Sequence, residues 1–411
     1  MIDLNLNLCH FDRVFRENGR DPGGKFGLGK GKGMKVTIIG ASISGLFSAY
    51  LLAREGVEVE VYERSDVLGW PPRTLIVTSK LNEVLDFVPE EAIINRVNYL
   101  ELFSKSNSAK LELSEPDLVI EREKLIHLLA SLAKEGGAKI LLGHLFTGLA
   151  RFGRKIVATI RQIETGEERS VSSDVLVGAD GAFSAVCTPS LNGHRLASLL
   201  QAKVMLPEGM DSKTCQVWFD PVRTKYFYWL IPEGGQRASV GLIADGAEEA
   251  EACLETFLHE RSLEPLEFQS APVPIHRFEH PFSLQKSNQN VFIIGDAAAQ
   301  VKGTTVGGLV TGLHGAKALA NSLLNGGNLR KESRNLRLEL NLHLLVRHIL
   351  NRFNDENYDE LIGMLNGGLK DILEEWTRDQ LTQSFWKLIL TEPRLVTLGA
   401  KTLLRSIFYW S

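Results

Sequence analysis

Three glycine-rich segments, far apart in the chain, each follow a short apolar run and carry polar groups suited to holding a ligand. The first is Gly40-Ala41-Ser42-Ile43-Ser44-Gly45, which follows the β-branched run Lys35–Ile39. A strand, a tight glycine turn and a helix in this order form a dinucleotide fingerprint, in which small residues let the backbone approach a pyrophosphate. Ser42 stands at the second glycine position, where its hydroxyl could itself bond a phosphate. The predicted contacts are Gly40, Ser42, Ser44 and Gly45.

The acid that this fingerprint requires is also present. Leu46–Arg54 is typical of a helix, and Val57–Tyr62 alternates as a second strand that ends at Glu63. An acid at this place takes the ribose hydroxyls of a dinucleotide. A plain strand-turn-helix would give the glycines without the acid, so the combination favours a nucleotide. Glu63 and the adjacent Arg64 join the predicted contacts.

The second segment, Asp174–Gly181 (DVLVGADG), is a strand that delivers Asp180-Gly181 at its carboxyl end. Open α/β sheets bind their ligands at the carboxyl ends of the strands, so Asp180 is a candidate. An ordinary Asp-Gly turn after a strand is the commoner source of this pattern. The segment carries weight only together with the other two.

The third segment is Val291–Ala298 (VFIIGDAA), followed by a loop rich in small residues up to Gly308. An aspartate at the end of a strand can accept hydrogen bonds from sugar or ribityl hydroxyls. The loop opens a helix whose first amides favour negative charge, such as that of a reduced flavin. The alternative is a glycine-rich turn with a capping aspartate. The predicted contacts are Gly295, Asp296, Gly307, Gly308 and Leu309.

The composition of the chain excludes several other classes of protein. With 411 residues, 44% apolar and 23% charged, it is typical of a globular protein of two or three domains. A net charge of −4 gives no reason to expect a nucleic-acid partner. The four cysteines form no C-x-x-C pair, so we expect no metal site and no disulfide framework, and a cytoplasmic protein. No apolar run is long enough to span a membrane, and the N-terminus does not resemble a signal peptide.

The order of the elements predicts an α/β fold: a Rossmann-like domain, an inserted antiparallel-sheet (α+β) substrate domain and a helical C-terminal tail. We expect the Rossmann-like domain to comprise residues 34–190 and 285–325, the insert 191–284 and the tail 326–411. Residues 1–33 are rich in glycine and charge, which predicts a disordered extension or a chain that starts at Met34. The clearest further elements are helices at 122–134, 247–261 and 308–324 and strands at 139–142, 155–161, 214–219, 226–231 and 238–243.

Taken in order, GASISG with Tyr62-Glu63-Arg64, DVLVGADG and IIGDAAAQVKGTTVGGL resemble the three flavin motifs of the p-hydroxybenzoate-hydroxylase-like FAD-dependent oxidoreductases. Within them the chain most resembles the geranylgeranyl reductase family, archaeal type, from Met34 to the C-terminus. Gly69–Thr74 is similar to that family's G-x-P-x-x-C segment, and Glu121–Leu125 to the arginine before its long helix. Arg347–Tyr358 is similar to its helical tail.

The resemblance implies FAD as the cofactor. Motif by motif it implies FAD contacts at Gly45, Glu63, Asp296, Gly308 and Leu309, at Arg122, at Thr74 and, through its backbone, at Phe146. Thr74 stands where the family has cysteine, so a thiol cannot assist the reaction here. Ser42 is a second departure from the pattern.

The resemblance also implies the reaction, a hydride transfer from reduced flavin to a C=C bond of a geranylgeranyl or other isoprenoid lipid. Tyr226–Pro232 would line the substrate cavity, because aromatic faces suit a polyprenyl chain. Strand alternation lets only one of Tyr228 and Trp229 face the ligand, and a plain core strand is the alternative. No residue stands out as the proton donor. NAD(P)H and ferredoxin both remain possible electron donors.

Two rival functions keep the same fold. One is a flavin monooxygenase or halogenase, in which reduced flavin meets oxygen first. The other is a non-catalytic flavoprotein, which the loss of the cysteine at Thr74 favours. Phe385–Trp410 mixes apolar and basic residues, which is typical either of a helix packed on the protein's own core or of a peripheral contact with a membrane surface.

Overall fold

A computed structural model describes residues 33–187, 196–277 and 290–408. The predicted β-α-β unit is present as β1 (Lys35–Ile39), α2 (Ile43–Ala53) and β2 (Glu58–Tyr62). Helix α2 begins three residues earlier than expected, because the Ser42 hydroxyl accepts a hydrogen bond from the Gly45 amide and caps the helix. The predicted N-terminal extension lies outside the described residues, apart from Gly33.

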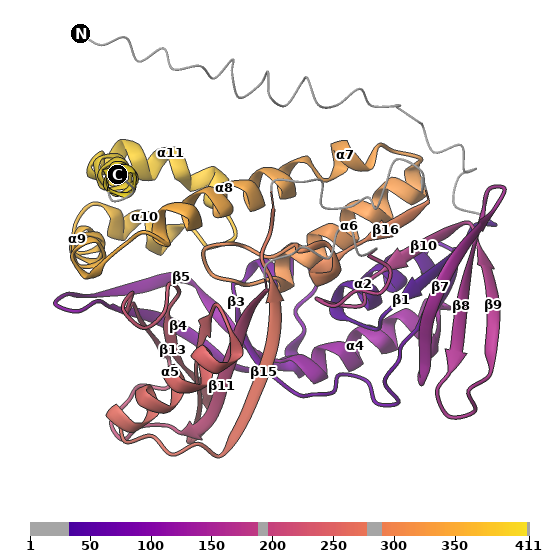
Figure 1. The fold of residues 1–411 in the computed structure, drawn as a ribbon, viewed down its shortest axis with the longest axis horizontal. Coiled ribbons are helices and arrows are strands. Elements are labelled where there is room, and N and C mark those ends of the chain that lie inside the picture. The colour runs from indigo at the N-terminus through magenta and orange to yellow at the C-terminus, as the bar shows by residue number, and fades with distance from the viewer. Residues whose placement is uncertain (1–32, 188–195, 278–289, 409–411) are drawn as a thin grey trace, which may run out of the picture.

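A five-stranded parallel sheet, in the order β16-β10-β1-β2-β6, brings the three glycine-rich segments together. Its other strands are β6 (Lys139–Leu141), β10 (Val175–Gly178) and β16 (Val291–Ile293). Since β1, β10 and β16 are parallel neighbours, their carboxyl ends meet at one edge of the sheet. This confirms the Rossmann-like fold, with its last strand contributed from far along the chain (Figure 1).

Alternate residues of the parallel sheet pack into two different layers. One face, which includes Val36, Ile38 and Val177, packs with α2, α4 (Arg122–Glu135) and α6 (Leu309–Asn325). The other face, which includes Ile39 and Leu176, packs with a three-stranded sheet of β7 (His144–Phe152), β8 (Lys155–Gln162) and β9 (Glu168–Ser173). Burial on both faces explains why β10 and β16 are continuous apolar runs.

A second, eight-stranded sheet has the order β15-β11-β14-β13-β12-β4-β5-β3 and is antiparallel except where β12 pairs with β4. The strands from the predicted insert are β11 (Leu196–Met205), β12 (Thr214–Trp218), β13 (Tyr228–Gly234), β14 (Arg237–Ala244) and β15 (Glu267–Pro274). Helix α5 (Ala247–Glu260) covers its outer face, where Phe257 stacks on Tyr228 with ring centroids 4.4 Å apart. The predicted sheet insert is therefore present.

The eight-stranded sheet is larger than the predicted range 191–284, because three of its strands come from the segment assigned to the Rossmann-like domain. These are β3 (Thr74–Val77), β4 (Ile93–Phe103) and β5 (Ser108–Glu121). The first half of β5 alternates exposed polar residues with the buried Ala109 and Leu111, which is typical of a strand with one buried face. Its conformation is decided by pairing with β4, which in turn pairs with the distant β12.

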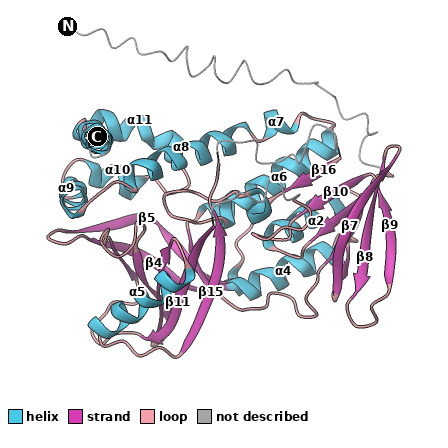
Figure 2. Cartoon of the chain, viewed as in Figure 1, coloured by secondary structure: helices cyan, strands magenta, loops and turns pink. Residues whose placement is uncertain are grey.

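The C-terminal region is helical, as predicted, and lies beside the eight-stranded sheet (Figures 1 and 2). Helices α9 and α10 contact β5, and α11 and α12 contact α8. In the part of the chain that the structure describes, none of the helices is long and apolar enough to cross a membrane. The C-terminal helices are α7 (Leu329–Glu332), α8 (Arg334–Leu350), α9 (Asp355–Leu365), α10 (Leu369–Glu375), α11 (Leu381–Thr391) and α12 (Arg394–Phe408). Outside this region, the short helix α3 (Lys80–Leu85) lies between β3 and β4 in the sequence.

Candidate functional site

The glycines of the first segment allow a close approach of strand and helix. A Cβ atom on Gly40, whose φ is +100°, would lie 2.4 Å from the carbonyl oxygen of Ala179, and one on Gly45 would lie 2.4 Å from that of Gly40. Only glycine fits at either position. The turn between them, with Ser42, Ile43 and Ser44, lines a cavity at the carboxyl edge of the parallel sheet.

We expect Gly45→Ala to break this contact, because the Gly40 carbonyl is backbone and cannot move aside. The variant should lose most of its bound flavin and several degrees of thermal midpoint. Gly148→Ala is the matched control, since a Cβ there meets nothing within 4 Å. Flavin absorbance and thermal unfolding of both variants measure the effect, and equal behaviour of the two would contradict this role of Gly45.

The carboxylate of Glu63 holds the glycine turn in place. Its Oε2 accepts a hydrogen bond of 2.7 Å from the Ala41 amide, and its Oε1 accepts one of 3.0 Å from the Ser65 amide. The acid therefore lies beside the turn that would carry the pyrophosphate, and its predicted contact with a ribose stays a prediction. Arg64 is exposed and lies outside the cavity wall.

Asp180 acts through its own turn. Its carboxylate accepts hydrogen bonds from the Ser184 hydroxyl at 2.5 Å and from the Ala185 amide at 2.7 Å. These bonds shape the segment in which Gly181 lines the cavity. A direct contact of Asp180 with a ligand is therefore less favoured than a contact made by the turn.

Asp296, Arg73 and Arg122 form a charged cluster in the cavity wall. Burial raises the pKa of Asp296, while the two guanidinium groups oppose that shift. Burial, and then the charge of Arg122, lower the pKa of Arg73 to about 10. The buried Nε of Arg73 finds no hydrogen-bond partner among the described residues. A ligand with hydroxyl and anionic groups would satisfy this cluster.

Arg73 was not predicted from the sequence, although it precedes Thr74 in the Gly69–Thr74 segment. Arg122 donates hydrogen bonds to the carbonyls of Gly69 at 2.9 Å and Pro71 at 3.3 Å. These bonds hold the Gly69–Thr74 segment beside the third motif, so Arg73 lies close to Asp296. An arginine in a flavin-like segment was the available signal. Nothing in its spacing pointed to a particular acid.

The loop before α6 completes this end of the cavity with groups that lack partners among the described residues. Gly307, Gly308 and Leu309 line the cavity, and the helix start has no side-chain cap. The buried Oγ1 of Thr305 has no partner among the described residues. Unpaired helix amides, an orphaned hydroxyl and the glycine turn fit a dinucleotide cofactor with a charged ring system.

Thr74, in the position of the family's cysteine, also lines the cavity. Its hydroxyl donates a hydrogen bond of 2.6 Å to Glu233 on β13, and its carbonyl accepts one of 3.2 Å from the side-chain amide of Gln201 on β11. The sheet curls far enough for β3 to meet strands that are remote in its order. Thr74 therefore belongs to the Gly69–Thr74 segment and is also anchored by hydrogen bonds to β13 and β11 of the eight-stranded sheet.

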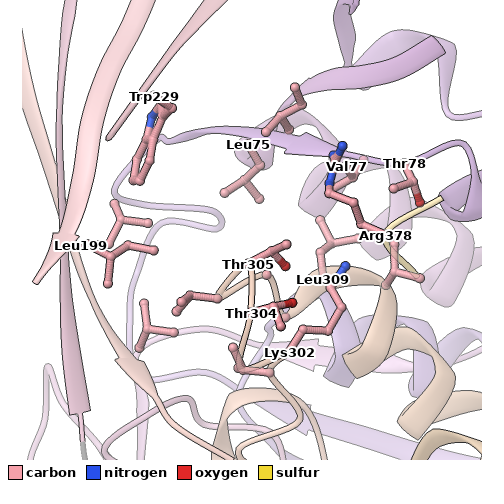
Figure 3. A pocket seen from close by; sticks show the side chains of 18 of the residues that line it. Leu75, Val77, Thr78, Leu199, Trp229, Lys302, Thr304, Thr305, Leu309 and Arg378 are labelled. Carbon is pink, nitrogen blue, oxygen red and sulfur yellow. The ribbon is translucent and has the colours of Figure 1, made fainter. Parts of the chain in front are cut away.

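Beyond this end the cavity becomes apolar, with a total volume of about 500 Å³. Figure 3 shows Trp229 and Leu199 facing the loop with Thr304 and Thr305, and Leu75 and Val77 on β3 close by. The apolar wall comes mainly from the eight-stranded sheet, which includes β3, and from the loop before α6. Its residues are Leu75, Ile76, Val77, Leu100, Leu102, Leu199, Val217, Phe219, Phe227, Trp229, Ile231, Ile243, Val273, Val301, Val306 and Leu309.

Like Arg64, the predicted residues Tyr228 and Phe146 lie outside the cavity wall. Tyr228 points to the opposite face of β13 from Trp229 and stacks on Phe257, so of these two alternatives Trp229 lines the cavity and Tyr228 does not. Strand alternation forces this choice. Phe146 lies in the core between the parallel and three-stranded sheets, outside the cavity wall, and its backbone contact with FAD stays a prediction.

Charged residues that sequence reasoning missed line the far side of the cavity. Lys302, on the loop before α6, forms a buried ion pair of 2.5 Å with Asp379, which also accepts a hydrogen bond of 2.7 Å from Thr78. Arg378 pairs with the buried Asp117 of β5 at 2.6 Å. The partners of each pair are far apart in sequence, so no local motif marks them. These pairs fasten the segment before α11 to the loop before α6 and to β5.

The described residues contain no cluster of side chains able to hold a metal ion. Cys187, Cys215 and Cys253, the cysteines among them, are free thiols.

Comparison with known proteins agrees with this site. Residues 33–333 match the family described as FAD binding domain. The chain is 27% identical over 291 residues to digeranylgeranylglycerophospholipid reductase 1 of Methanopyrus kandleri, covering 68% of this chain and 77% of that protein. It is 25% identical over 368 residues to digeranylgeranylglycerophospholipid reductase of Methanocaldococcus jannaschii, covering 82% and 92%.

Two solved structures share the fold. A geranylgeranyl bacteriochlorophyll reductase-like protein from Thermoplasma acidophilum has a TM-score of 0.74 at 19% identity, over 90% of this chain and 99% of that one. A probable FAD-dependent monooxygenase from Pseudomonas aeruginosa has a TM-score of 0.62 at 17% identity, over 80% and 99%. The protein belongs to the FAD binding domain family and is an FAD-dependent oxidoreductase that is similar in sequence to archaeal digeranylgeranylglycerophospholipid reductases.

Proposed function

We propose that the protein reduces C=C bonds in the isoprenoid chain of a lipid. The observation that carries the proposal is one continuous cavity, which begins at the FAD-binding loops and continues between apolar walls that include Trp229. The names of the archaeal relatives support the same substrate class. A polyprenyl chain offers no hydrogen bonds, so its affinity must come from buried apolar area, at about 25 cal/mol per Å².

Bound FAD, once reduced, supplies the hydride for such a reaction. The protein's own residues would position the reactants: Asp296 and Arg73 would hold the polar part of the cofactor, and the uncapped amides at the start of α6 would favour negative charge on its ring. The side chains of Trp229 and Leu199 would pack against the alkene on the side opposite the loop that precedes α6, and their apolar surface would exclude water from it. The electron donor, NAD(P)H or ferredoxin, is left open by this arrangement.

A peripheral contact with a membrane surface is a further part of the proposal, because a lipid substrate resides there. Trp386 and Leu390 on α11 are 64% and 78% exposed, and Lys387 lies between them in the sequence. The opposite side of α11 packs on α8, so the tail packs on the protein and still presents apolar side chains. Loss of vesicle binding in a Trp386→Ser variant, with flavin content unchanged, would support this contact.

The decisive experiment is a single turnover without oxygen. The flavin is reduced with dithionite, excess reductant is removed, and a lipid with geranylgeranyl chains is added. Reoxidation of the flavin together with a lipid that is heavier by two mass units per reduced bond is the expected result. A flavin that stays reduced until oxygen is admitted, with oxygen consumed in proportion to product, would instead identify a monooxygenase.

Trp229→Ala should weaken the binding of long prenyl substrates more than short ones, because the lost indole contacts only the longer chains. Flavin content should stay unchanged. Tyr228→Leu is the matched control on the opposite face: it should lower thermal stability by removing the stack on Phe257, with no dependence on chain length. Michaelis constants for substrates of two to four isoprene units measure the effect, and an equal loss for all lengths in Trp229→Ala would count against the cavity assignment.

A further inference from the structure

Three polar side chains lead from the cavity wall into the C-terminal helical region. Thr304 lines the cavity on the loop before α6, next to Thr305 in Figure 3. Its Oγ1 lies 2.6 Å from Nδ1 of His343 on α8. The other ring nitrogen of His343, Nε2, lies at the ion-pair distance of 3.2 Å from Oε1 of Glu339, one helical turn earlier, and has no hydrogen-bond partner of good geometry among the described residues. A hydroxyl, an imidazole and a carboxylate in series can move a proton along the chain.

The surroundings hold these groups in fixed positions. Glu339 accepts hydrogen bonds from the backbone amides of Leu381 at 2.6 Å and Thr382 at 2.9 Å, at the start of α11. The His343 side chain is buried. The loop itself is fixed by Arg347, which donates hydrogen bonds to the carbonyls of Gly303 at 2.7 Å and Thr304 at 2.5 Å. Because Arg347 already ties the loop to α8, a titratable imidazole is not needed for that purpose.

We propose that Thr304 donates the proton that completes alkene reduction, and that His343, oriented by Glu339, returns a proton to Thr304. This inference rests on the proposed function. The π bond breaks and two C–H bonds form: one hydrogen arrives as hydride, with the electron pair of the reduced cofactor, and the other as a proton from the Thr304 hydroxyl. The hydroxyl takes a proton from Nδ1 of imidazolium His343 and leaves a neutral ring, which is reprotonated from solvent before the next turnover.

The direction of transfer follows from how many hydrogens each group carries. A protonated His343 donates from both nitrogens, from Nε2 toward Glu339 and from Nδ1 toward Thr304. The single hydroxyl hydrogen of Thr304 is then free to point into the cavity. Thr304 thus touches the substrate, whereas His343 and Glu339 act through it.

The charges around His343 set the pH at which the relay operates. Burial is the largest influence and lowers the pKa of His343; Lys302 lowers it further, whereas Glu339 and Asp379 raise it. A lower pKa makes the imidazolium a stronger acid, which suits the protonation of carbon. The protonated fraction falls as pH rises, so the rate of the alkene step should fall with rising pH through the pKa of His343.

The test separates the two half-reactions. Thr304→Val and His343→Asn should slow the anaerobic reoxidation of reduced flavin by a prenyl lipid by about 10²-fold, which is typical of a lost general acid. Flavin binding and reduction by dithionite should stay at wild-type values. Thr304→Ser keeps the hydroxyl and should restore the rate, and His127→Asn, on the exposed side of α4, is the matched histidine control. The pH dependence of the wild type should be absent in His343→Asn.

A measurement without turnover tests the chain itself. NMR titration of the histidine ring in flavin-loaded protein, with the His343 signal assigned from its absence in His343→Asn, should show a lower pKa in Glu339→Gln. An unchanged titration, or a wild-type rate and pH profile in Thr304→Val, would overturn the relay and leave the proposed reductase standing. If no prenyl lipid reoxidises the wild-type flavin, the reductase proposal fails and the relay falls with it.

Discussion

Asp296→Ala should raise the dissociation constant of FAD by about 10- to 100-fold, which corresponds to the loss of hydrogen bonds worth about 1–3 kcal/mol. The Asp296 carboxylate lines the cavity between Arg73 and Arg122. No hydrogen bond from the rest of the described chain occupies it, so it is free to accept from the ribityl or ribose hydroxyls. Its removal also leaves two partly buried guanidinium groups without their nearest acid.

Asp180→Ala is the matched comparison, because both aspartates follow a strand of the parallel sheet. The Asp180 carboxylate is already occupied by the Ser184 hydroxyl and the Ala185 amide. Its loss should loosen a turn and weaken FAD binding only several-fold. Fluorescence titration of each apoprotein with FAD measures both constants. Equal losses in the two variants would refute the assignment of Asp296 as the direct contact.

Asp379→Leu should destabilise the protein by about 3–5 kcal/mol, the usual cost of removing one partner from a buried ion pair. The Lys302 and Asp379 side chains are only 7% and 4% exposed, so the remaining ammonium would be both buried and unpaired. Because Lys302 belongs to the loop before α6, flavin binding should weaken together with stability. The expected readouts are the thermal midpoint and the free energy of unfolding in denaturant.

The double variant Lys302→Met/Asp379→Leu tests the physical reason. Replacing both charges by apolar groups removes the uncompensated ammonium, so the double variant should regain most of the lost stability. If the double variant were less stable than the single one by the full cost of a second substitution, the ion pair would not be the cause.

The same pair predicts a dependence of stability on pH. Lys302 and Thr78 lower the pKa of Asp379 in the folded protein, against the effect of burial. A carboxyl whose pKa is lower in the folded than in the unfolded state stabilises the fold above its unfolded pKa, and the contribution is lost as pH falls through the folded pKa. The wild type should therefore lose more stability on acidification than the double variant. Thermal midpoints at a series of acidic pH values measure the difference.

The sequence by itself determined the cofactor-binding half of this protein. The runs Lys35–Ile39, Val175–Gly178 and Val291–Ile293 are apolar on both faces, as only strands buried on two sides are, and each ends in a glycine motif. Parallel strands must place those ends at one edge. Local composition therefore specified the single strands and the turn at Gly40–Gly45, because each of these depends on residues that are neighbours along the chain, whereas the predicted contacts with FAD stay predictions.

Only the tertiary structure decided the rest of the cavity. The strands β3, β4 and β5 extend the eight-stranded sheet beyond its predicted range, because β4 pairs with the distant β12 and β5 pairs with β4. Strand alternation requires Tyr228 and Trp229 to point to opposite faces of the sheet, but it does not say which face is which. Helix α5 packs on the face with Tyr228, so Trp229 faces the cavity. The contacts of Lys302 with Asp379 and of Thr304 with His343 join residues that are 77 and 39 positions apart in the sequence, with several helices between them. Such long-range pairs leave no periodic trace, since side chains meet through the fold of the backbone and not through their spacing in sequence.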